Sequence, residues 1–136
     1  MGVSKSRLAL IETDDRKHGV KVSLAALKLN PVKGKNVLIK PNFNTADQTP
    51  GSTHNDTLLA LVEELWEMGA KSISLGERSY PRTRTVMEQK GILPIMDEKD
   101  VQVIDFDDLG DKDWIKFKPK GTHWSDGFRI ARPILD

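Results

Sequence analysis

The pattern of apolar and polar positions is clearest between residues 37 and 76, where it predicts a strand, a polar loop, a helix and a second strand. Residues 37–40 are a short apolar run, and residues 73–75 are another. Between them, residues 54–68 carry large apolar side chains on one helical face: Leu58, Leu61, Val62, Leu65 and Trp66. Two apolar strands joined by an amphipathic helix are typical of a right-handed parallel βαβ unit.

The segments on either side predict further helices and strands. Residues 8–11 are strand-like, and residues 20–29 favour a helix that ends before Pro31, because a residue preceding proline avoids the helical conformation. Downstream, the pattern predicts a helix that is capped by Thr83 or Thr85 and runs to Gln89, another helical turn or two over residues 92–99, and a strand over residues 101–104.

The last part of the chain predicts a β-hairpin. Residues 114–118 and 127–132 alternate in polarity and are joined by a turn-rich link. The expected fold is therefore α/β, a mainly parallel sheet with crossover helices in Rossmann-like layers plus this C-terminal hairpin. We interpret residues 1–136 as a single domain, and the apolar run that ends the chain suggests that it is the N-terminal part of a larger one.

Composition excludes several classes of function. Lys and Arg total 21 against 20 Asp and Glu, and this balance argues against a nucleic-acid-binding surface. The chain has no cysteine, so it can supply no disulfide, thiolate zinc site or cysteine-ligated iron–sulfur cluster of its own. No apolar run approaches the ~20 residues that span a bilayer, and no signal-like segment is evident. We expect a cytoplasmic protein without membrane contact.

Candidate chemistry lies where the central strands end, because ligands of parallel α/β sheets bind outside the carboxyl ends of the strands. The first loop, residues 41–53, and the residue before it offer four ligand-binding candidates for a phosphate or carboxylate near a helix start: Lys40, Asn42, Ser52 and Thr53. The alternative is purely structural: Thr53 caps the helix, with Asp56 completing a capping box. Neither the Walker pattern nor the dinucleotide glycine triplet occurs.

The second loop, residues 77–84, is expected beside the first one. Arg78 and Arg82 are candidate ligands for a planar anion, and Glu77 is a candidate acid, base or metal ligand. Solvation of a surface loop is the competing explanation for each residue taken singly. His54 is the other candidate acid or base, and the three histidines lack the close spacing of a metal pair, so we predict no metal site.

Several of these segments resemble one known family. The motifs are residues 37–42, residues 51–54, the pair Glu64 and Leu65, and residues 69–76. Together they resemble the family catalogued as domain of unknown function 362, and the resemblance extends from about Leu8 to Asp136. Members of that family often carry ferredoxin-like iron–sulfur modules, which this cysteine-free chain lacks. A weaker likeness in layout links it to the N-terminal domain of nickel-dependent lactate racemase, whose loop motif is absent here.

Two functional hypotheses follow, and neither defines a cofactor or a reaction. In the first, the domain binds a small anionic metabolite or cofactor between residues 41–53 and 77–84, with His54 or Glu77 as acid or base. In the second, it is a non-enzymatic accessory module that docks on an iron–sulfur redox protein through residues 128–135. An exposed sheet edge would also favour pairing of two copies into a homo-oligomer.

Overall fold

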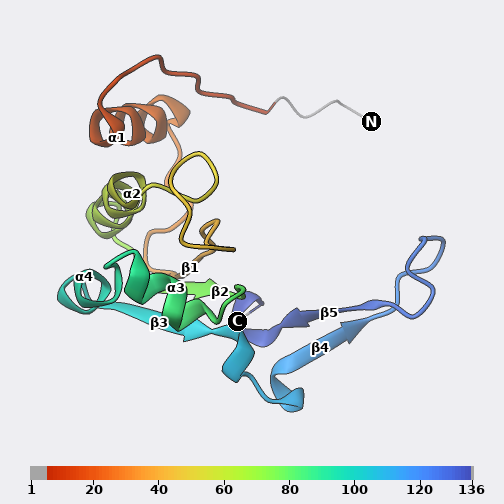
Figure 1. Cartoon of the computed structure of the whole chain (residues 1–136). Helices are drawn as coiled ribbons and strands as arrows, with labels where there is room; N and C mark the ends of the chain where they lie inside the picture. Colours follow the sequence, from red (N-terminus) through yellow and green to blue (C-terminus); the bar gives the residue numbers. More distant parts are fainter. Residues whose placement is uncertain (1–5, 136) are drawn as a thin grey trace, which may run out of the picture.

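A three-stranded parallel sheet and a separate two-stranded hairpin organise the computed structural model, which describes residues 6–135 (Figure 1). The sheet consists of β1 (Asn36–Ile39), β2 (Ser72–Glu77) and β3 (Val101–Asp105), in that order. Ile73 at the centre lies opposite Val37 on one side and Val101 on the other. The predicted α/β class and all three of these strands are confirmed.

The helices that connect the strands form the core with the sheet. α2 (Asn55–Glu67) links β1 to β2, and α3 (Thr83–Gln89) and α4 (Leu93–Glu98) link β2 to β3. The sequence predicted all three helices, but the predicted cap of α3 by Thr83 or Thr85 is wrong, because Arg82 occupies the N-cap position and makes no side-chain cap hydrogen bond. Fully or almost fully buried apolar side chains come from each of these elements: Leu58, Val62, Ile73, Leu75, Val86, Met87 and Met96.

The first helix, α1 (Arg16–Leu27), packs against α2 (Figure 1). It begins four residues before the predicted start at Val20, because the Asp15 carboxylate accepts a hydrogen bond from the His18 backbone N–H at 3.0 Å and caps the helix. It ends at Lys28, which has a positive φ of 52°. No residue of α1 is fully buried, so this helix covers α2 without entering the core.

The predicted strand at residues 8–11 is wrong. These residues are extended but pair with no strand of the described chain, and Leu8 and Leu10 are 91% and 90% exposed. The segment is held to α1 at Arg7, whose guanidinium donates to the Leu27 carbonyl at 2.9 Å. Four consecutive apolar residues are typical of a strand, but this segment has no ladder partner in the described chain and therefore forms no strand.

The hairpin of β4 (Trp114–Phe117) and β5 (Phe128–Ala131) confirms the prediction for the C-terminal part. Between β3 and β4 the acidic connection forms two short 3-10 helices, η1 (Phe106–Asp108) and η2 (Asp111–Asp113), and a third, η3 (Arg132–Ile134), follows β5. Figure 1 shows the hairpin extending away from the parallel sheet.

Gly76 lets the acidic connection lie against the sheet. A Cβ atom at this position would stand 2.6 Å from Cζ of Phe106 and 3.0 Å from Cδ1 of Leu38. Phe106 is buried and begins η1, so its ring has little room to withdraw. The absence of a side chain at Gly76 therefore sets how closely the turn after β3 approaches the end of β2.

We predict that Gly76→Ala lowers the free energy of unfolding by roughly 1–3 kcal/mol, the typical cost of overpacking a buried site. The measurement is urea denaturation followed by circular dichroism. Gly110→Ala is the matched control, since a Cβ there meets only Asp113 Oδ2 at 3.6 Å. Equal effects of the two substitutions would contradict this account of Gly76.

A small charge network joins three helices. Glu63 of α2 accepts from Lys17 of α1 at 2.7 Å and from Lys99, which follows α4, at 3.2 Å. The hydrogen bond from Lys17, followed by that from Lys99, lowers the pKa of the Glu63 carboxyl below its ordinary value. Because the folded-state pKa is depressed, the stabilisation is complete above the unfolded pKa and is lost as pH falls through the folded one.

Glu63→Gln is expected to lower the melting temperature by at most a few degrees at pH 7, because the pairs are partly exposed and screened. The difference from the wild type should shrink as pH falls below the ordinary glutamate pKa of about 4.3. Thermal melts between pH 3 and pH 7 provide the measurement. Glu98→Gln, at an exposed position without an ion pair in the described chain, is the control, and a pH-independent deficit in Glu63→Gln would refute the assignment.

Candidate functional site

The start of α2 is capped by His54. Its Nδ1 atom accepts a hydrogen bond from the Asp56 backbone N–H at 3.1 Å, and its carbonyl accepts from Leu58 N–H. The predicted capping box with Thr53 is therefore wrong. The Thr53 hydroxyl instead accepts from the Asn42 backbone N–H at 2.9 Å, so it closes the first loop and is unavailable to the helix.

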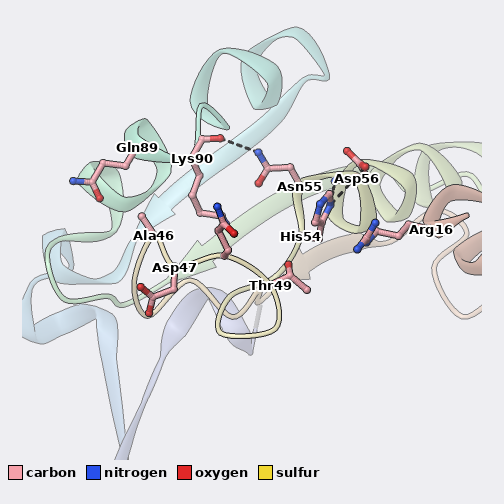
Figure 2. A pocket seen from close by; sticks show the side chains of 10 residues that line it. Arg16, Ala46, Asp47, Thr49, His54, Asn55, Asp56, Gln89 and Lys90 are labelled. Carbon is pink, nitrogen blue, oxygen red and sulfur yellow. Dashed lines mark hydrogen bonds and ion pairs between the residues drawn. The ribbon is translucent and has the colours of Figure 1, made fainter. Parts of the chain in front are cut away.

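His54 lines a cleft of about 570 Å³ between the first loop and the start of α2 (Figure 2). Arg16 of α1 and Lys90, which follows α3, supply positive charge to the wall, while Asp47 and Asp56 supply negative charge. Two contacts fix the position of Lys90. Its ammonium lies 5.0 Å from the centre of the Phe43 ring, and its carbonyl accepts from the Asn55 side-chain amide at 2.8 Å.

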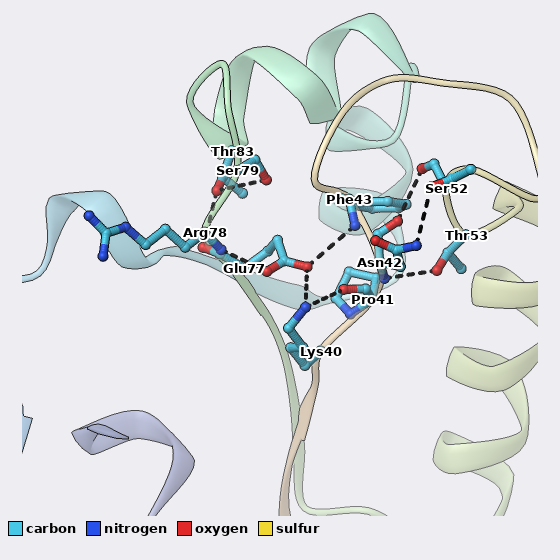
Figure 3. Close-up of polar contacts among 11 residues, drawn as sticks. Lys40, Pro41, Asn42, Phe43, Ser52, Thr53, Glu77, Arg78, Ser79 and Thr83 are labelled. Carbon is cyan, nitrogen blue, oxygen red and sulfur yellow. Dashed lines mark hydrogen bonds and ion pairs between the residues drawn. The ribbon is translucent and has the colours of Figure 1, made fainter. Parts of the chain in front are cut away.

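The first loop is held closed by its own polar groups (Figure 3). The Asn42 side chain donates to the Gly51 carbonyl at 3.2 Å, and the Asn42 carbonyl accepts from the Ser52 hydroxyl at 3.1 Å and from Thr53 N–H at 2.9 Å. Ser52 is only 2% exposed. The structure thus brings the predicted residues Asn42, Ser52 and Thr53 together, and their polar groups bond to one another across the loop.

Glu77, the last residue of β2, connects the two loops. Its Oε2 atom accepts from the Lys40 ammonium at 2.8 Å and from Phe43 N–H at 3.3 Å, and its Oε1 atom accepts from Arg78 N–H at 2.9 Å (Figure 3). The side chain is 4% exposed. A buried carboxylate needs such donors to replace water. One carboxylate therefore fixes the end of β1, the first loop and the start of the second loop.

The arginines of the second loop form ion pairs with aspartates that follow β3. Arg78 donates to Asp107 at 2.9 Å, and Arg82 pairs with Asp108. Both guanidinium side chains are largely exposed. Behind them, the buried Thr83 hydroxyl donates to the Glu77 carbonyl at 3.1 Å and fixes the base of the loop.

These arginines lie on a cleft of about 890 Å³ at the carboxyl ends of β1 and β2. The first loop contributes to it as well, because the Asn44 carbonyl accepts from Tyr80 N–H at 3.1 Å. We call this the arginine cleft, and its lining residues are Asn44, Arg78, Ser79, Tyr80, Pro81, Arg82 and Asp107. The structure brings Arg78 and Arg82 to one cleft, whereas His54 lines the other.

Sequence reasoning missed the acidic partners of the arginines. Asp107 and Asp108 follow β3, in an acidic segment whose sequence is typical of a surface turn. The signal was present, since the carboxyl end of β3 meets the same sheet edge as that of β2. Within residues 6–135, no three His, Asp or Glu side chains are grouped so that they would hold a metal ion.

The fold and the loops at its carboxyl edge define an α/β domain with a polar cleft built on parallel strands. The chain belongs to the family described as domain of unknown function (DUF362), whose model matches residues 37–136. This match confirms the resemblance noted in the sequence. No curated protein and no solved structure gives a significant match. Among the helices described, none combines the length and apolar character that crossing a membrane requires.

We predict that Glu77→Gln lowers the free energy of unfolding by roughly 2 kcal/mol, because an amide cannot satisfy all the donors that converge on the carboxylate. Lys40→Met should cost less, about 1 kcal/mol or below, since the Lys40 side chain is 62% exposed and water replaces its contact. Urea denaturation of both variants tests this order, with Glu88→Gln on the surface of α3 as the control. A larger loss of unfolding free energy in Lys40→Met than in Glu77→Gln would show that Lys40, and not the Glu77 carboxylate, is the main stabilising group.

Proposed function

We propose that this domain binds a small anionic metabolite or cofactor, bearing a carboxylate or phosphate group, in the arginine cleft between residues 41–53 and 77–84. One observation carries the proposal: Arg78 and Arg82 reach the same cleft at the carboxyl ends of parallel strands. The proposal treats the sheet as part of a Rossmann-like layered fold, in which ligands bind at this edge.

The existing ion pairs do not oppose such a ligand strongly. The Arg78–Asp107 and Arg82–Asp108 pairs lie at the surface, with the arginine side chains 69% and 61% exposed. Exposed pairs of this kind contribute little free energy. A ligand whose oxygens contact both guanidinium groups forms paired, charge-assisted hydrogen bonds, and it can therefore displace the aspartates.

The remaining predicted residues have a supporting role in this proposal. Glu77 and Lys40 tie the two loops together, and Asn42, Ser52 and Thr53 keep the first loop closed. This support keeps Asn44 and Tyr80 in contact at the cleft wall. A rigid wall reduces the conformational entropy lost when a ligand binds. Direct contact of the ligand with the other predicted binding residues stays a prediction: Lys40, Asn42, Ser52 and Thr53. Acid or base chemistry by His54 or Glu77 also stays a prediction.

The test is titration of the ¹⁵N-labelled protein with inorganic phosphate and with malonate, monitored by NMR. We expect shifts in the amides of residues 78–82 and a dissociation constant that rises roughly tenfold or more in Arg78→Ala/Arg82→Ala. Arg132→Ala, an exposed arginine outside the cleft, is the matched control. Absence of shifts at residues 78–82, or equal binding by the double variant, would rule out the arginine cleft as the anion site.

Asp107→Asn tests the same proposal by a change that is expected to strengthen anion binding. Removing this carboxylate charge frees Arg78, so the variant should bind the same anion about two- to fivefold more tightly than the wild type. The same titration measures it. A weaker complex would show that Asp107 holds Arg78 in its binding position rather than competing with the ligand.

A further inference from the structure

The hairpin presents an apolar face that the rest of the described chain leaves open. Directly opposed residues of an antiparallel pair share a face, so Ile115 and Ile130 lie on the same side as Phe117 and Phe128. The two phenylalanine rings stack at 5.8 Å, and Trp124, 62% exposed, packs edge-on against Phe128 at 6.0 Å. We call these five side chains the hairpin face.

The hairpin carries an excess of positive charge. Residues 114–132 contain five basic side chains and one acidic one, Asp126. Arg129 pairs with Asp111 at 2.9 Å, and Lys116 lies directly across from Arg129 on the opposite face of the hairpin. In the described part of the chain, Lys118 and Lys120, which follow β4 toward Trp124, have no carboxylate at ion-pair distance. A partner that fits this surface combines apolar side chains with nearby acidic ones.

Residues 8–15 have this combination. Leu8 and Leu10 project outward from an extended backbone and are 91% and 90% exposed, whereas Ala9 and Ile11 between them are half-buried. Three acidic residues, Glu12, Asp14 and Asp15, follow directly, and the segment contains no basic residue. Among residues 6–135, no backbone hydrogen bond involves residues 8–11, so their N–H and C=O groups are open as in an unmatched strand.

We propose that residues 8–15 of one copy of this chain dock on the hairpin of a second copy, with Leu8 and Leu10 on the hairpin face and the acidic residues near its lysines. Within one chain the two surfaces are apart: the segment runs beside α1, and the hairpin extends away from the end of the parallel sheet (Figure 1). Exchange between two copies covers both apolar surfaces and pairs their opposite charges.

The first test is the oligomeric state, measured by sedimentation velocity over a range of protein concentrations. We expect a dimer that dissociates on dilution, and a dissociation constant roughly tenfold or more higher in Leu8→Ser/Leu10→Ser. Both leucines are exposed, so the substitutions leave the folded core intact. Leu29→Ser, at another exposed leucine, is the control. A monomer at every concentration, or a dimer unaffected by the double substitution, would overturn the proposal.

The second test locates the contact, and the absence of native cysteine makes it specific. Leu10→Cys protein and mass-tagged Phe117→Cys protein are mixed and treated with a short bismaleimide. A covalent heterodimer is expected from this pair. Lys116→Cys, on the opposite face of the same strand, should react far less. Equal yields from Phe117→Cys and Lys116→Cys would exclude docking on the hairpin face.

Discussion

A single buried carboxylate sets the geometry of the candidate site. Glu77 ends the central strand, and its two oxygens accept hydrogen bonds from both loops and from Lys40. Burying an ionised carboxylate is costly unless donors surround it, so the loops are stabilised only in the arrangement that supplies those donors. The positions of Asn44 and Arg78 at the arginine cleft follow from this arrangement.

The third strand completes the same edge of the sheet. Gly76 leaves room for the Phe106 ring, and this contact places Asp107 and Asp108 beside the arginines of the second loop. Gly76 in β2 therefore determines where the negative charge of these aspartates lies at the arginine cleft. Packing and charge are linked here, because a change that moves the ring also moves the carboxylates that neutralise the guanidinium groups.

Local patterns predicted most of the fold. The strands and the helix between residues 37 and 76 were predictable because their apolar periodicity agrees with their burial. The error at residues 8–11 arose because an apolar run is typical of a strand but does not supply a pairing partner. The error at Thr53 has a similar origin: a threonine before a helix is a good cap, but here a loop residue eleven positions away takes its hydroxyl. Both errors concern hydrogen bonds between residues far apart in the sequence, which local spacing does not indicate.

The first loop lies between the two clefts and lines both of them. Asn44 borders the arginine cleft, while residues 46–49, a few positions later, border the cleft that contains His54. Because Glu77 and Thr53 hold the two ends of this short segment, a ligand that displaces it from one side changes the shape of the other side. If ligands bind both clefts, their occupancies are thermodynamically linked, and the linkage is reciprocal: each ligand alters the affinity of the other by the same factor.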